Sequence, residues 1–204
     1  MTELTADLIV DLALLADMAL SPDGRQVAYT VKPVGKQAEH PLSALWLAPL
    51  DGSVPPRRLT AGTAEDRLPL WSPDGCYIAF LSDRAERGTV QLFVLSLAGG
   101  EARPLTAVKN KRPVLNMAWS PAGDRIAFTS ADEPDAEDER REKERDDADV
   151  FGERWQHARL RVVAPATGEI VVLAAGPRHI AECAWSPRGD ALAYFSWEIG
   201  RAHV

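Results

Sequence analysis

The feature that most constrains this chain is a five-residue corner that occurs four times. Its clearest copy, residues 71–75, reads Trp-Ser-Pro-Asp-Gly and runs directly into the apolar residues 76–80. The other copies occupy residues 20–24, 119–123 and 185–189, and a similar apolar run follows each one. Proline fixes φ, aspartate bonds to nearby backbone and glycine accepts positive φ, so the chain can reverse sharply between two strands. Each copy therefore predicts a hairpin.

The corners recur at a characteristic spacing. Their serines stand at positions 21, 72, 120 and 186, so successive copies lie 51, 48 and 66 residues apart, and repeats of about 40 to 50 residues are typical of β-propeller blades. A second repeat, shifted within the first, begins at Leu45, Leu92 and Leu160 and contains its own turn. Two hairpins per repeat make a four-stranded antiparallel sheet. The sequence therefore predicts an all-β fold, an incomplete β-propeller of about three and a half four-stranded antiparallel blades.

We divide the chain into an N-terminal helical segment (1–16), a partial propeller domain (17–198) and a tail (199–204). The blades are expected near residues 17–60, 67–106, 115–174 and 181–197, the last with two strands only. A short helix is predicted from Thr5 to about Leu15, because Thr5 can cap it and Leu8, Ile9 and Leu12 share one face. It either packs on the outside of the blades or contacts a further domain.

Blade three carries a charged insertion at residues 131–150, which explains its longer spacing. Residues 132–149 hold eleven acids and four bases, a net charge of −7 that equals the charge of the whole chain. A short exposed helix is predicted over residues 137–145, with opposite charges four residues apart in Glu137/Arg141 and Glu139/Lys143. The insertion is either a solvated loop or a functional element. In the second case its carboxylates recognise a peptide amine or contact another domain, and the candidate substrate-gating residues are Glu142, Glu144 and Arg145.

The tail, residues 199–204, can be encoded by ATC GGA AGA GCA CAC GTC, the read-through of a common sequencing adapter. We interpret it as non-native and expect the gene to continue beyond Glu198. Three and a half blades also leave open strand edges, so we expect the isolated chain to be poorly soluble or oligomeric.

Composition narrows the functional classes. The net charge of −7 argues against a nucleic-acid partner, since phosphate contacts need clustered Lys and Arg. No stretch approaches the roughly 20 apolar residues of a membrane span, and Glu3 and Asp7 stand where an export signal carries positive charge. Cys76 and Cys183 are expected to be free core thiols, as in a reducing cytosol. These features predict a cytoplasmic protein without membrane or nucleic-acid partners.

No residue of this chain shows the pattern of a catalytic or cofactor site. The sequence lacks the Gly-x-Ser-x-Gly turn that exposes a nucleophilic serine, so Ser21, Ser72, Ser120 and Ser186 are interpreted as turn residues. Gly99 and Gly100 form a hairpin turn, because no phosphate-loop lysine follows them. Four histidines lack metal-ligand spacing and are expected to be surface or packing residues: His40, His157, His179 and His203. We predict no catalytic, metal-binding or cofactor-binding residue.

A family resemblance rests on the combination of these segments. The N-terminal helix, Leu-Ser-Pro-Asp-Gly-Arg at 20–25, Leu-Trp-Leu at 45–47 and Arg-Arg-Leu-Thr at 57–60 resemble the start of the S9 (prolyl oligopeptidase family) serine peptidases. The charged run at 140–147 is similar to an insertion in the acylaminoacyl-peptidase and dipeptidyl-peptidase-like branch. The resemblance covers Leu4 to about Trp197, although the corners alone are shared with TolB-like propellers.

The resemblance implies that the propeller restricts access to an α/β-hydrolase domain, which carries a Ser-Asp-His triad and is absent from this chain. The parent protein would then hydrolyse short peptides by acyl transfer, whereas this chain would hydrolyse nothing. The alternative is a non-enzymatic TolB-like or WD40-like propeller that acts as a protein-binding scaffold. A third possibility, a functional protein in its own right, is disfavoured by the open strand edges.

Overall fold

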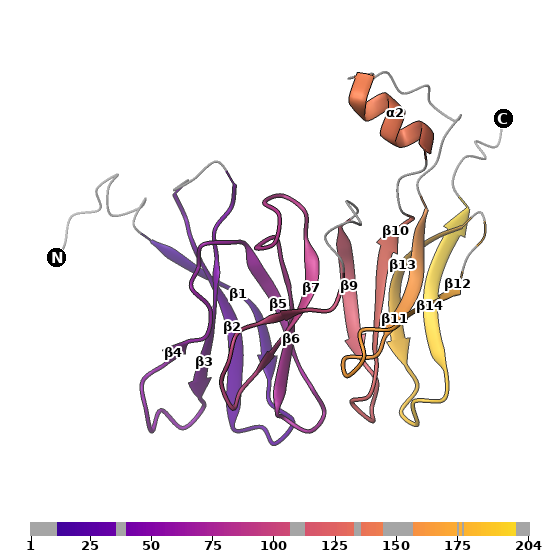
Figure 1. Ribbon diagram of the computed structural model, residues 1–204. Coiled ribbons are helices and arrows are strands. Elements are labelled where there is room, and N and C mark those ends of the chain that lie inside the picture. Colours follow the sequence, from indigo (N-terminus) through magenta and orange to yellow (C-terminus); the bar gives the residue numbers. More distant parts are fainter. Residues whose placement is uncertain are drawn as a thin grey trace. The chain divides into compact units, whose positions relative to one another are not determined.

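The computed structural model describes residues 12–35, 40–106, 113–132, 136–144, 157–174, 176 and 178–198. The chain divides into two compact units, residues 1–105 and 106–204, and each is described by itself. Both are built from antiparallel sheets whose strands follow one another in sequence order (Figure 1).

The first unit contains two four-stranded sheets. Blade one consists of β1 (Ala13–Leu20), β2 (Gln26–Pro33), β3 (Ala44–Pro49) and β4 (Arg57–Arg58). Blade two consists of β5 (Asp66–Trp71), β6 (Tyr77–Ser82), β7 (Gln91–Ser96) and β8 (Arg103–Pro104). The first strands of the two blades, β1 and β5, contact each other.

The second unit contains one four-stranded and one two-stranded sheet. Blade three consists of β9 (Val114–Trp119), β10 (Ile126–Ala131), β11 (Ala158–Val163) and β12 (Ile170–Ala174). Blade four consists of β13 (Arg178–Trp185) and β14 (Leu192–Glu198). Helix α2 (Ala136–Glu144) lies in the sequence between β10 and β11. The predicted all-β fold of four-stranded antiparallel blades is confirmed.

One prediction about the fold needs correction. The N-terminal helix was expected to reach Leu15, but Ala13, Leu14 and Leu15 belong to β1, where they pair with Pro33, Lys32 and Val31 of β2. Sheet pairing here overrides the helical pattern of the local sequence. Residues 1–11, which hold the rest of that prediction, lie outside the described part, as does the tail at 199–204.

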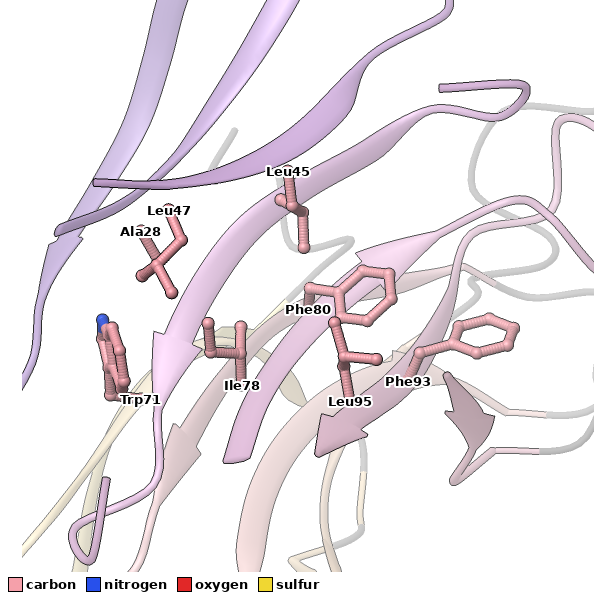
Figure 2. Close-up of a cluster of buried hydrophobic side chains, with 8 residues drawn as sticks. All are labelled: Ala28, Leu45, Leu47, Trp71, Ile78, Phe80, Phe93 and Leu95. Atoms are coloured by element: carbon pink, nitrogen blue, oxygen red, sulfur yellow. The ribbon is translucent and has the colours of Figure 1, made fainter. Parts of the chain in front are cut away.

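Each unit has its own apolar core between neighbouring blades. In the first unit eight buried side chains gather between the facing sheets, as Figure 2 shows: Ala28, Leu45, Leu47, Trp71, Ile78, Phe80, Phe93 and Leu95. In the second unit the cluster is Ala127, Leu160, Val162 and Ile180. Burying a large apolar side chain contributes about 1.5–3 kcal/mol, so the facing sheets hold each pair of blades together.

Neighbouring blades are also joined by equivalent hydrogen bonds along their first strands. The indole N–H of Trp71 donates to the Ala19 carbonyl over 3.0 Å, and that of Trp185 donates to the Ala118 carbonyl over 3.0 Å. In both pairs the tryptophan directly precedes the serine of its own corner, and the alanine stands two residues before the corner serine of the preceding blade. Trp71 therefore fixes blade two to blade one, and Trp185 fixes blade four to blade three.

The corners have two hydrogen-bonding patterns. In blades one and two the serine hydroxyl bonds to the aspartate two residues on, as in Ser21 Oγ to Asp23 Oδ1 (2.6 Å). In blades three and four that position holds alanine or arginine, and the serine bonds instead to Asp124 or Asp190, four residues on (2.7 Å in both). In all four blades the same serine oxygen accepts a backbone N–H five residues on. The corner therefore needs one carboxylate close to its serine, and this carboxylate can stand either two or four residues after the serine.

Candidate functional site

The two ends of a blade differ in chemistry. One end carries the tight corners, and the other carries the connector, the segment between the second and third strands of a blade. The connector of blade two has eight residues (83–90), whereas that of blade three has 26 (132–157) and includes α2. Variable loops on a rigid sheet are the usual place for binding residues, so the connectors are the candidate site.

The connector of blade two is closed by two buried carboxylates. Asp66 and Asp83 are each only 1% exposed. Asp66 Oδ1 accepts the Ser82 hydroxyl over 2.6 Å and the Arg84 guanidinium over 2.8 Å. Asp83 accepts the backbone N–H groups of Glu65 (2.8 Å) and Gly88 (2.9 Å) and pairs with Arg87. Buried charges that are paired and hydrogen-bonded in this way fix a single loop conformation.

Arg84 also lies over aromatic rings in blade two. Its guanidinium carbon is 4.9 Å from the centre of the Phe80 ring and 5.3 Å from that of Phe93. The cation therefore has a carboxylate partner and two aromatic faces, and 28% of its side chain is exposed. With these partners Arg84 serves to hold the connector rather than to receive a ligand.

In blade three the ends of the connector are tied by a different arrangement. Asp132, at the start of the connector, pairs with Arg159 (2.7 Å) and Arg161 (3.3 Å), both from β11. Arg161 also donates to the Ser130 hydroxyl over 2.8 Å, while Arg159 bonds to the Gly176 carbonyl. The two strand ends are thus joined at the first residue of the connector, so the length of the connector does not disturb the sheet.

Helix α2 matches the predicted helix within a residue or so at each end. Arg140 bonds to Glu137 (2.9 Å from Nε) and to Glu144 (2.8 Å). The candidate Glu144 is exposed and already has this cationic partner. The side chain of Glu142, and the whole of Arg145, fall outside the described part of the chain. Only the side chain of Glu144 can be placed, so the gating role of the three candidates stays a prediction.

The first strands contain bulges that the sequence did not indicate. Asp17 and Leu68 both have positive φ, 49° and 51°, and each stands four residues before its corner serine. The backbone N–H of Leu68 donates to Asp17 Oδ2 over 3.3 Å, which links the two bulges. In the second unit the Asn116 amide bonds to the Ala181 carbonyl at the corresponding place. Positive φ is costly for leucine, so this bulge is held by its surroundings.

The histidine and cysteine predictions hold in part. His179 has a packing role, because its ring lies 4.7 Å from Trp197 and its Nδ1 accepts the Ala158 N–H over 3.3 Å. Both cysteines are free thiols, as expected, but Cys76 is exposed and so is not a core residue. Cys183 is half-buried, and this burial raises the pKa of its thiol to about 11.

Three of the corner aspartates have shifted pKa values. Hydrogen bonding from the serine hydroxyl, and then from a backbone N–H, holds the pKa of Asp23 and of Asp74 below the ordinary value of 3.8. The Ser120 hydroxyl lowers the pKa of Asp124 in the same way. These shifts reflect turn structure, so they do not identify a catalytic acid.

In the described part of the chain, no three His, Cys, Asp or Glu side chains are grouped closely enough to hold a metal ion. Over the same residues, no helix has the length and apolar character needed to cross a membrane.

Comparison with known proteins decides the family. The family described as TolB beta propeller domain matches residues 15–154. This chain belongs to the TolB β-propeller family. Among curated proteins, an uncharacterized peptidase of Bacillus subtilis, YuxL, is 33% identical over 207 residues, which is 94% of this chain and 31% of the relative. The chain thus spans about a third of that peptidase.

Solved structures show the same fold in two kinds of protein. The Pyrococcus horikoshii acylaminoacyl peptidase aligns with a TM-score of 0.60 at 18% identity, covering 95% of this chain and 32% of that protein. A TolB of Agrobacterium tumefaciens aligns with a TM-score of 0.57 at 25% identity, covering 91% of this chain and 60% of that one. The predicted relationship to the propellers of S9 peptidases is confirmed, and the chain is equally related in fold to TolB.

Proposed function

We propose that this TolB-type propeller is the access-controlling part of a serine-type peptidase that hydrolyses short peptides by acyl transfer. The match to a protein named as a peptidase over 94% of this chain carries the proposal. The catalytic triad would belong to a hydrolase domain outside these 204 residues. This domain is the principal proposed partner, and the proposed location is the cytoplasm.

In this proposal the connectors control the access of substrate. Short, ion-paired connectors such as residues 83–90 would form fixed walls, whereas the long connector of blade three would place charge near the substrate. Within it, Glu142 and Glu144 are proposed to attract the positive amino terminus of a peptide, with Arg145 beside them. Arg140 already pairs with Glu144, so Glu142 is expected to contribute more.

The peptidase proposal is tested on the full-length protein encoded by this gene. We expect it to hydrolyse dipeptidyl or acylaminoacyl reporter substrates and to lose activity on treatment with a serine-directed fluorophosphonate. Under the same conditions the 204-residue chain should neither hydrolyse these substrates nor react with the reagent. A full-length protein that is inactive and unlabelled, although folded, would reject the proposal.

The role of the insertion is tested separately in the same protein. Glu142→Gln with Glu144→Gln should reduce the preference for peptides with a free amino terminus over blocked ones by severalfold. The matched control is Glu86→Gln, which neutralises an exposed acid in the connector of blade two. Unchanged selectivity in the double variant would show that these two carboxylates do not recognise the substrate. The peptidase proposal would not be affected by that result.

A non-enzymatic scaffold is the second candidate, and the TolB structure that aligns with 91% of this chain favours it. In that case the full-length gene would encode further blades without a Gly-x-Ser-x-Gly segment. The coding sequence beyond codon 198 distinguishes the two candidates.

A further inference from the structure

Blade one contains a cavity that neither its core nor its ion pairs account for. The cavity has a volume of about 260 Å³ and lies where β2 ends and β3 begins. Its apolar wall includes Val31, Ala44 and Trp46, and Arg58 of β4 contributes a positive charge. Ala44 is buried, Trp46 is half-buried and Arg58 is exposed. The cavity therefore runs from the interior of the blade to a cation at the surface.

The backbone after β4 holds the Arg58 guanidinium in place. Its Nε–H donates to the Thr60 carbonyl over 2.8 Å, and Nη2 bonds to the Ala61 carbonyl. Gly62 completes this cradle, because a Cβ there would overlap Nη2 and its φ of +68° suits glycine. The side chain is thus positioned, although it is exposed.

Arg58 retains both its charge and several of its donors. A guanidinium has five N–H donors, and the two carbonyls use only two of them. Among the described residues no carboxylate pairs with Arg58. In blade two the equivalent position is Pro104. The residue after each position makes the same backbone bond, because the Leu59 N–H donates to the Leu45 carbonyl and the Leu105 N–H donates to the Leu92 carbonyl. The blade repeat therefore does not require an arginine here.

We propose that this cavity binds the C-terminal residue of a short peptide, or an equivalent N-acylated amino acid with an apolar side chain. The carboxylate would pair with the free N–H groups of Arg58, whose fork geometry suits two parallel bonds to a carboxylate. The apolar side chain would lie against Val31, Ala44 and Trp46. Sites for small ligands combine such an apolar wall with a few fixed polar groups. The proposal does not depend on whether the parent protein is a peptidase.

The test uses the 204-residue chain and two probes, N-acetyl-L-leucine and its uncharged amide, N-acetyl-L-leucinamide. Saturation-transfer NMR and calorimetric titration should show weak binding of the acid, with a dissociation constant of about 1 mM for a ligand of this size. The amide should bind about tenfold more weakly or worse, because it lacks the charge-assisted bonds. Arg58→Gln should weaken binding of the acid by a similar factor, and Arg58→Lys by less.

The matched control is Arg57→Gln, which removes a neighbouring exposed arginine of the same strand that does not line the cavity. It should change binding of the acid by less than about twofold, as expected for a screened surface charge. Circular dichroism establishes that each variant is folded. The proposal is overturned if the folded chain binds no acid up to about 20 mM, if the amide binds as well as the acid, or if Arg57→Gln weakens binding as much as Arg58→Gln.

Discussion

The connectors of blades two and three begin at equivalent strand ends but are held in opposite ways. In blade two the arginine belongs to the connector and the carboxylate to the first strand, in the pair Arg84–Asp66. In blade three the carboxylate belongs to the connector and the arginine to the third strand, in the pair Asp132–Arg161. Arg161 occupies the register position of Phe93, the ring on which Arg84 rests.

This difference explains why only one of the two connectors carries a long insertion. In blade two, Asp83, Arg84 and Arg87 all belong to the connector and make its closing contacts, so its length is tied to its stability. In blade three the bonds are made at Asp132, the first residue of the connector. The strand ends are then secured, and additional residues cost only loop-closure entropy, which grows slowly with length. Blade two is therefore closed by contacts that its connector makes, whereas blade three is closed by contacts at its strand ends.

The largest expected effect comes from removing the buried carboxylate of blade two. Asp66→Ala should destabilise the first unit by about 3 kcal/mol, because it leaves the Arg84 guanidinium and the Ser82 hydroxyl without their acceptor. Asp132→Ala should cost only about 1 kcal/mol in the second unit, since the Asp132 side chain is 50% exposed. Hydrogen exchange of β6 and β10 amides measures the two effects separately. Equal losses in the two units would contradict the comparison.

Replacing the connectors themselves should give an asymmetric effect. Exchange of residues 133–156 for a short Gly-Ser loop should change the stability of the second unit by less than about 1 kcal/mol. Exchange of residues 84–89 for a Gly-Ser loop of the same length should destabilise the first unit by more, because it removes Arg84 and Arg87. Urea unfolding of both variants, followed by hydrogen exchange, gives the comparison. A larger loss from the blade three exchange would show that its insertion is part of the blade.

The smallest expected effect on stability comes from the corners, which lie at the opposite end of the same strands. Because blades two and three both have a corner of this kind, the corners serve as an internal control for the comparison of the connectors. Asp74 and Asp124 have lowered pKa values in the folded state, so the stabilising contribution of these two carboxylates is complete above about pH 4 and is lost as the pH falls through the folded pKa. Ser72→Ala and Ser120→Ala remove the main cause of the shifts at Asp74 and Asp124. Both variants should lose less stability than the parent chain between pH 5 and pH 2, and to a similar extent. The measurement is thermal melting across this range, and a steeper acid loss in either variant would contradict the assignment.

The blades were predictable from the sequence because their corners are local. Proline, glycine and a nearby acid determine a hairpin within five residues, so the strands fall close to their expected positions. The corner serine bonds to Asp23 or Asp74 in blades one and two, but to Asp124 or Asp190 in blades three and four. This change of partner was not predicted, because it depends on which carboxylate reaches the serine in space. The helical expectation for residues 13–15 failed for a similar reason, since pairing with β2 determines their conformation.

The candidate gating residues stay a prediction, and the buried charges of the fold were not among them. The sequence drew attention to the dense charges of the insertion, yet the buried and partnered charges are Asp66, Asp83 and Arg161. None of the three was singled out, because their burial and their partners come from strand pairing and from the closing of a connector, not from a motif. Arg58 was noticed only as part of the Arg-Arg-Leu-Thr segment at 57–60, because its cavity is assembled from residues of β1, β2, β3 and β4.

The most direct test of the account is a measurement of peptide length selectivity in the full-length protein. The parent form and the variant with residues 133–156 exchanged for a Gly-Ser loop are compared on a series of peptides of increasing length. We expect the parent form to hydrolyse only short peptides, and the variant to keep this activity and also to accept longer ones. A full-length protein that hydrolyses no peptide, or a variant with the same length limit as the parent, would contradict it.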